Sequence, residues 1–86
     1  MIERKITNTI KDESGKIIAL ANPVEWWSPR MTTEVINDIE ETFYEYYLLL
    51  DGKKVLLKIM NGKGEKHLRT DPNLTNRNKL VDLPGF

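Results

Sequence analysis

The stretch of residues 43–60, FYEYYLLLDGKKVLLKIM, limits the possible folds more than any other part of the chain. Two runs rich in Tyr, Leu, Val and Ile flank the pair Asp51-Gly52. A two-residue type I′ turn needs positive φ at both central residues, which Asp and Gly tolerate. The stretch therefore predicts an antiparallel β-hairpin over residues 43–60, in which Leu50 faces Lys53.

This register divides the hairpin into two faces, because successive residues of a strand point to opposite sides. One face carries an apolar row that we expect to lie on the core: Tyr44, Tyr46, Leu48, Val55, Leu57 and Ile59. The other face is mixed and needs only partial cover, with three opposed pairs: Tyr47 and Leu56, Leu49 and Lys54, Glu45 and Lys58.

The length of 86 residues suits one hydrophobic core, so we treat residues 1–86 as a single domain. The chain has no cysteine, which excludes a disulfide framework, a thiolate nucleophile and a cysteine metal site. Its apolar runs are too short for a transmembrane helix or a signal peptide. We therefore expect a cytoplasmic protein that does not bind membranes.

The N-terminal part predicts a first hairpin over residues 2–21. Residues 2–11 alternate in polarity, with Ile2, Ile6 and Ile10 on one side. The sequence Asp-Glu-Ser-Gly at 12–15 is typical of a turn, and residues 16–21 then return as a second strand. The proline that follows ends this strand, because proline has no N–H to donate to a ladder.

Residues 22–31 are predicted to form a loop that contains both tryptophans, Trp26 and Trp27. Adjacent residues of an extended segment point in opposite directions, so at most one of the two can face the core. The other is a candidate contact for a ligand or partner, since tryptophan is enriched at interface hot spots. A cap over an open edge of the core is the alternative role.

A helix is predicted over residues 32–42, because four apolar residues fall on one face at helical spacing: Met31, Val35, Ile36 and Ile39. Ser28 and Thr32 can each cap its N-terminus, and Thr32 is preferred. Glu40 and Glu41 would lie at the negative end of the helix dipole, where a cation from the basic part of the chain would be favourable.

Residues 61–86 are predicted to form a turn at 61–64, a short strand at 65–70 and an ordered tail with one helical turn. We expect leucines of the tail to cover Tyr47, Leu49 and Leu56 on the second face of the central hairpin. The fold class is α+β: an antiparallel sheet of four to five strands, in the order ββαββ(β), with one amphipathic helix packed on it. Two stacked hairpins with the helix plugging one end are the alternative.

The C-terminal part holds a distinctive pattern, His-Leu-Arg-Thr-Asp-Pro at 67–72, followed by Asn76, Asn78, Leu80 and Leu83-Pro84. Together with Trp26-Trp27-Ser28, Asp38-Ile39-Glu40 and Tyr46-Tyr47, it resembles the small bacterial proteins grouped as domain-of-unknown-function family 3892. The resemblance covers nearly the whole chain, but His67 replaces a usual tyrosine and Lys79 a usual asparagine. The family has no assigned activity, so the resemblance implies a stand-alone domain and transfers no catalytic residue.

His67, with Asp71 four residues further on, could act as an oriented base. No phosphate-binding loop, metal-ligand spacing or serine nucleophile motif accompanies this pair. We therefore expect no enzyme activity, no metal and no cofactor. In the alternative role, Asp71 accepts backbone hydrogen bonds in a turn and Arg69 pairs with an acidic residue of the helix.

The charges are unevenly distributed, although the formal net charge is zero. Residues 1–52 carry five Lys/Arg and ten Asp/Glu, whereas residues 53–79 carry eight Lys/Arg and two Asp/Glu. This basic stretch makes nucleic-acid binding one hypothesis, with an exposed tryptophan as a stacking surface. The acidic first part can instead neutralise it within the fold.

The favoured hypothesis is a non-catalytic protein-binding or regulatory module, because a small β-rich domain without a catalytic motif usually works through its surface. The protein partner is unknown, and the chain is expected to be a monomer or weak homodimer. The candidate contact residues are Trp26, Trp27, Lys66, His67, Arg69 and Arg77.

Overall fold

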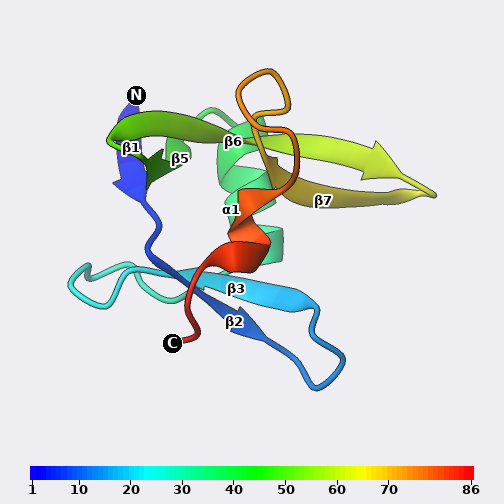
Figure 1. The fold of residues 1–86 in the computed structure, drawn as a ribbon, viewed down its shortest axis with the longest axis horizontal. Coiled ribbons are helices and arrows are strands. Elements are labelled where there is room, and N and C mark those ends of the chain that lie inside the picture. Colours follow the sequence, from blue (N-terminus) through cyan, green and yellow to red (C-terminus); the bar gives the residue numbers. More distant parts are fainter.

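The structure, a computed structural model that describes residues 1–86, contains seven strands, one α-helix and one 3₁₀ helix. In chain order these are β1 (Ile2–Lys5), β2 (Asn8–Lys11), β3 (Ile17–Ala21), β4 (Arg30–Met31), α1 (Thr32–Glu40), β5 (Tyr44–Leu50), β6 (Lys53–Gly62), β7 (Glu65–Thr70) and η1 (Lys79–Asp82). The strands form two sheets, β1-β5-β6-β7 and β2-β3-β4, and α1 contacts strands of both (Figure 1). The predicted α+β class with a single α-helix is confirmed.

The central hairpin has the predicted register. Leu50 of β5 lies opposite Lys53 of β6, and the turn residues Asp51 and Gly52 have φ of 51° and 78°. Strand β6 continues to Gly62, so the predicted turn at 61–64 shrinks to two residues, 63 and 64, which again have positive φ. A second hairpin thus joins β6 to β7.

The core lies on the predicted face of the central hairpin. Four hairpin side chains are buried there: Tyr46, Leu48, Val55 and Leu57. Tyr46, Leu48 and Leu57 form one cluster with side chains from the other elements: Ile6, Leu20, Trp27, Val35, Leu68 and Leu80. Burying a large apolar side chain contributes about 1.5–3 kcal/mol. This cluster therefore joins both sheets, the helix and the C-terminal segment.

The predicted first hairpin over 2–21 is wrong in its first half. Strand β2 pairs with β3 as expected, but β1 pairs in parallel with β5 of the other sheet, so that this sheet is mixed. The chain changes sheets at Ile6 and Thr7, whose N–H groups donate to carbonyls of β5 and β3, each at 2.9 Å. Alternation of polarity cannot reveal this change, because a strand keeps its two-residue period in either sheet.

Helix α1 is two residues shorter than the predicted 32–42, and Thr32 is its first residue and not its cap. Met31 is the N-cap, and its N–H donates to the Glu34 carboxylate at 3.0 Å. At the other end, Lys66 of β7 forms an ion pair with Glu40. The basic part of the chain thus supplies the cation expected at the negative end of the helix dipole. No helix in the structure has the length and apolar character that crossing a lipid bilayer requires.

The C-terminal tail is ordered, but the surface predicted for it was wrong. Leu80 of η1 enters the core, and Leu49 on the second face of the hairpin stays exposed. The tail is fixed to the outer edge of β7 by the Asn78 side chain, which accepts the N–H of Thr70 and donates to the carbonyl of Leu68, both at 3.3 Å. The distinctive C-terminal pattern therefore has a structural role.

Candidate functional site

Only one of the two tryptophans of the loop between β3 and β4 faces the core, as the sequence predicts. Trp27 is 8% exposed and Trp26 is 85% exposed. The Trp27 ring meets the Tyr46 ring edge-on, with 5.9 Å between centroids and an interplanar angle of 86°. The two residues stand in a turn and not in the extended segment that the prediction assumed, and the anchoring of Trp27 in the core leaves Trp26 in solvent.

The loop that carries Trp26 is fixed by hydrogen bonds. The N–H of Asn22 donates to the Ser28 hydroxyl at 2.9 Å, which ties the two ends of the loop together. The Asn22 side chain donates to the Lys5 carbonyl at 3.0 Å, which ties the loop to β1. A tight turn between them is closed by the N–H of Glu25, which donates to the Asn22 carbonyl at 2.9 Å.

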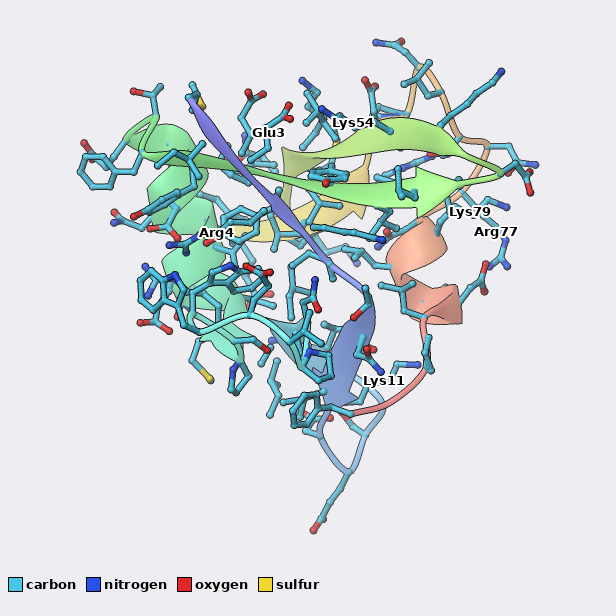
Figure 2. The ribbon with its side chains drawn as sticks, turned by 90° about the vertical axis from the view of Figure 1, so that its left-hand side faces the viewer. Glu3, Arg4, Lys11, Lys54, Arg77 and Lys79 are labelled. Atoms are coloured by element: carbon cyan, nitrogen blue, oxygen red, sulfur yellow. The ribbon has the colours of Figure 1, made fainter.

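Arg4 connects this loop to the sheet. Its guanidinium carbon lies 3.5 Å from the centroid of the Tyr44 ring, 5.1 Å from that of Trp27 and 5.6 Å from that of Trp26. Contacts of this kind contribute about 0.5–2 kcal/mol each. Arg4 is only 5% exposed and points from β1 toward α1, whereas Glu3 leaves the strand on the other side (Figure 2). The exposed tryptophan therefore rests beside a buried cation.

A buried polar network holds Arg4 in place. Its Nη1 donates to the Tyr46 hydroxyl at 2.9 Å, and that hydroxyl donates to Asp38 at 2.5 Å. Arg30 donates two further bonds to Asp38, both at 2.9 Å. The network joins β1, β4, α1 and β5 through the single carboxylate of Asp38.

The network fixes the protonation of its members. Burial alone would raise the pKa of Asp38, but hydrogen bonds from Arg30 and Tyr46 outweigh burial and hold that pKa below its ordinary value. Burial, and then the bond to the Asp38 carboxylate, raises the pKa of Tyr46 to about 12. At neutral pH the carboxylate is therefore ionised and the phenol is protonated.

Sequence reasoning missed this network, because it considered only the isoleucines of residues 2–11 and the apolar residues of the helix, and assigned no contact to Arg4 or Asp38. One signal was available. Arg4 shares its side of β1 with Ile2 and precedes the buried Ile6 by two residues, so it is an arginine on an apolar face. Such a charge needs buried partners.

Other apolar side chains are exposed in the loop of Trp26 and on β1. Val24 is exposed in the same loop, and Ile2 is exposed on β1 opposite Tyr44. Arg4 contacts both the Tyr44 and Trp26 rings, so these two rings lie around one guanidinium group. We call Ile2, Val24, Trp26 and Tyr44 the Trp26 surface.

The other predicted site residues lie elsewhere. Lys66, His67 and Arg69 are on β7, and β7 and β1 are opposite edges of the four-stranded sheet. Arg77 lies beyond β7, beside η1 (Figure 2), where it pairs with Asp82. The six candidate residues therefore form two separate groups.

The contacts predicted around the β7 turn are partly wrong. Arg69 does not pair with an acid of the helix but donates to the carbonyls of Thr70 and Thr75, at 3.2 and 3.1 Å. Asp71 accepts the N–H of the residue two positions on at 2.9 Å, as the turn interpretation predicts. No hydrogen bond joins Asp71 to His67, so the structure does not form the oriented pair.

The basic stretch is partly neutralised within the fold. Three of its cations form ion pairs, Lys54 with Glu3, Lys66 with Glu40 and Arg77 with Asp82. The first of these pairs is visible on the outer face of the sheet in Figure 2. Four lysines of the stretch make no ion pair: Lys53, Lys58, Lys63 and Lys79.

Fold and site together define a small α+β domain with a buried arginine-tyrosine-aspartate network and an exposed aromatic surface. The chain belongs to the family described as "Protein of unknown function (DUF3892)", whose model matches residues 5–84. The family resemblance seen in the sequence is thereby confirmed, and the match includes both tryptophans and the C-terminal pattern. No curated protein and no solved structure matches the chain.

Proposed function

We propose that this domain is a protein-binding module that docks a partner protein on the Trp26 surface. The observation that carries the proposal is that Trp26 is 85% exposed although its loop is fixed by hydrogen bonds and by the buried Trp27. A tryptophan ring buries roughly 150–250 Å² when it is covered, and tryptophan is the residue type most typical of binding hot spots. The partner expected is a protein with an apolar pocket for this ring.

The rigid loop supports this role energetically. Immobilising a flexible side chain on binding costs about 0.5–1.5 kcal/mol, and a loop that is already ordered avoids much of that cost. Val24, exposed in the same loop, and Ile2, exposed on β1, are further apolar side chains that a partner can cover. The Arg4 guanidinium supports the ring from within the protein.

The test compares protein capture by the wild-type domain and by Trp26→Ala, followed by affinity measurement with the purified partner. We expect Trp26→Ala to cost about 2 kcal/mol or more, which is roughly a 30-fold loss of affinity. Trp26→Phe should recover part of this loss, because it restores an aromatic ring. The matched control is Leu74→Ala, which shortens another exposed apolar side chain and should leave binding unchanged.

Thermal unfolding should give Trp26→Ala a midpoint within about 4 °C of the wild type, because the exposed ring loses a contact with Arg4 at the weak end of the range, about 0.5 kcal/mol. A partner that binds the wild type and Trp26→Ala equally well would refute the proposal.

A further inference from the structure

A groove of about 520 Å³ runs along the outer edge of β7, on the side of the sheet away from the Trp26 surface. This volume lies within the range of ligand pockets in proteins, roughly 300–1,000 Å³. The groove is bounded by Glu65–Leu68 of β7, the first turns of α1, the start of β3 and η1. Ile17, Ile36 and Val81, which keep part of their surface accessible, give it apolar walls.

The groove follows the backbone edge of β7 and not one of its faces. Four consecutive residues, 65 to 68, line it, although successive side chains of a strand point to opposite faces. Only the edge of a strand presents consecutive residues to the same space. β7 is such an edge, because β6 is its only neighbour in the sheet.

The register shows which backbone groups point into this space. The two-residue turn at 63 and 64 makes Gly62 and Glu65 a hydrogen-bonded pair. Residues 65, 67 and 69 therefore direct their N–H and C=O groups toward β6, and Lys66, Leu68 and Thr70 direct theirs outward.

The outward groups at one end are already occupied. The Asn78 side-chain amide accepts from the N–H of Thr70 and donates to the carbonyl of Leu68, as the peptide group of a neighbouring strand would. Three groups next to it make no hydrogen bond within the protein: the N–H of Leu68 and both the C=O and N–H of Lys66. These are a donor, an acceptor and a donor in the spacing of a sheet ladder.

We propose that this edge binds an extended peptide segment of a partner protein, which adds as a strand to β7 beside Asn78. Backbone hydrogen bonds to Lys66 and Leu68 hold the segment, and alternate apolar side chains enter the groove, as in other cases of strand addition. The proposal does not depend on the Trp26 surface.

The charges around the groove select an acidic segment. Two lysines, Lys16 and Lys66, line the groove, against one acidic residue, Glu65. Lys66 is paired with Glu40, but Lys16 forms no ion pair. The best occupant therefore carries carboxylates at the positions between its apolar side chains.

The test is a titration of the ¹⁵N-labelled full chain with a synthetic peptide of alternating glutamate and valine, followed by nuclear magnetic resonance. We expect saturable shifts at the Lys66 and Leu68 amides, and slower exchange of both amide protons with solvent. The same peptide with alternate backbone amides methylated should bind about tenfold more weakly or worse, because the donors to the β7 edge are removed.

Two further variants make the result specific. Lys16→Glu should weaken binding of the acidic peptide and favour a lysine-valine peptide, whereas Trp26→Ala should bind like the wild type. The proposal is overturned if no peptide gives saturable shifts at millimolar concentration, if the shifts map away from β7, or if methylation of the backbone leaves the affinity unchanged. If the peptide does not bind but the wild-type domain still captures a partner through the Trp26 surface, the peptide proposal fails and the proposed function stands.

Discussion

At the scale of single residues, Tyr46 is the centre of the buried network. Its hydroxyl accepts from Arg4 and donates to Asp38, so one oxygen bridges a cation and a carboxylate that are both almost completely buried. Removing a partner from a buried polar group costs about 1–3 kcal/mol. Arg4 also supports the Trp26 ring, so this network determines the shape of the proposed binding surface.

Tyr46→Phe should lower the free energy of unfolding by about 1–3 kcal/mol at neutral pH, because Arg4 and Asp38 each lose a partner. The folded state raises the pKa of Tyr46 from 10.0 to about 12, so the stabilising contribution is complete below pH 10 and is lost as pH rises from 10 to about 12. Urea unfolding between pH 10 and about 12 measures the slope of the free energy of unfolding against pH. The slope should be smaller in Tyr46→Phe, and an unchanged slope would mean that Tyr46 does not titrate as described.

At the scale of elements, the central hairpin separates a buried from an exposed face. Leu57→Ala should cost about 2–5 kcal/mol, because it leaves a cavity in the core cluster. Leu49→Ala on the other face should change the free energy of unfolding by about 0.5 kcal/mol or less, since Leu49 is exposed. Urea unfolding of both variants provides the comparison, and a reversed order would invert the assignment of faces.

The C-terminal segment gives a second test at this scale. Asn78→Ala removes both hydrogen bonds to the β7 edge, so we expect a loss of about 1–3 kcal/mol and faster amide exchange at Thr70. Asn76→Ala is the matched control, because its side chain is exposed and makes no hydrogen bond. Equal stability of Asn78→Ala and Asn76→Ala would contradict the claim that the Asn78 side chain fixes the tail to β7.

Sequence reasoning succeeded where the information is local. The positive φ that Asp51 and Gly52 tolerate and the alternation on either side fix the central hairpin without reference to the rest of the chain. The prediction that at most one of Trp26 and Trp27 faces the core holds, although the pair stands in a turn and not in an extended segment. Which of them is buried depends on the Tyr46 ring that receives Trp27.

The errors concern contacts between distant parts of the chain. The change of sheet at Ile6 and Thr7 depends on β5, which lies about forty residues away. The burial of Asp38 depends on arginines from β1 and β4. The docking of Leu80 depends on a space that the two sheets and the helix enclose. The residues near Leu80 in the sequence do not indicate that this space exists.

At the scale of the whole molecule, the two proposed contact regions lie at opposite edges of one sheet, with the Trp26 surface beside β1 and the groove beside β7. The ion pairs of Lys54, Lys66 and Arg77 bring acidic residues against the basic stretch. These three pairs neutralise part of the positive charge of residues 53–79 within the fold.

We therefore expect no measurable binding to random single- or double-stranded oligonucleotides, even at ~50 mM salt, where phosphate contacts are strongest. Fluorescence anisotropy over a salt series measures this. Tight binding that falls steeply with salt, and that weakens in Lys66→Ala and Arg69→Ala, would support the nucleic-acid hypothesis instead.

The most direct measurement of the central claim is photocrosslinking from the Trp26 surface in the native host. A photoreactive phenylalanine analogue replaces Trp26 in one variant and the exposed Leu74 in a second. The account predicts a discrete crosslinked protein from position 26 and none of that mass from position 74, with an excess of unmodified wild-type domain suppressing the product. Crosslinks that are equally diffuse from both positions, or the same product from both, would contradict the claim that Trp26 binds a partner protein.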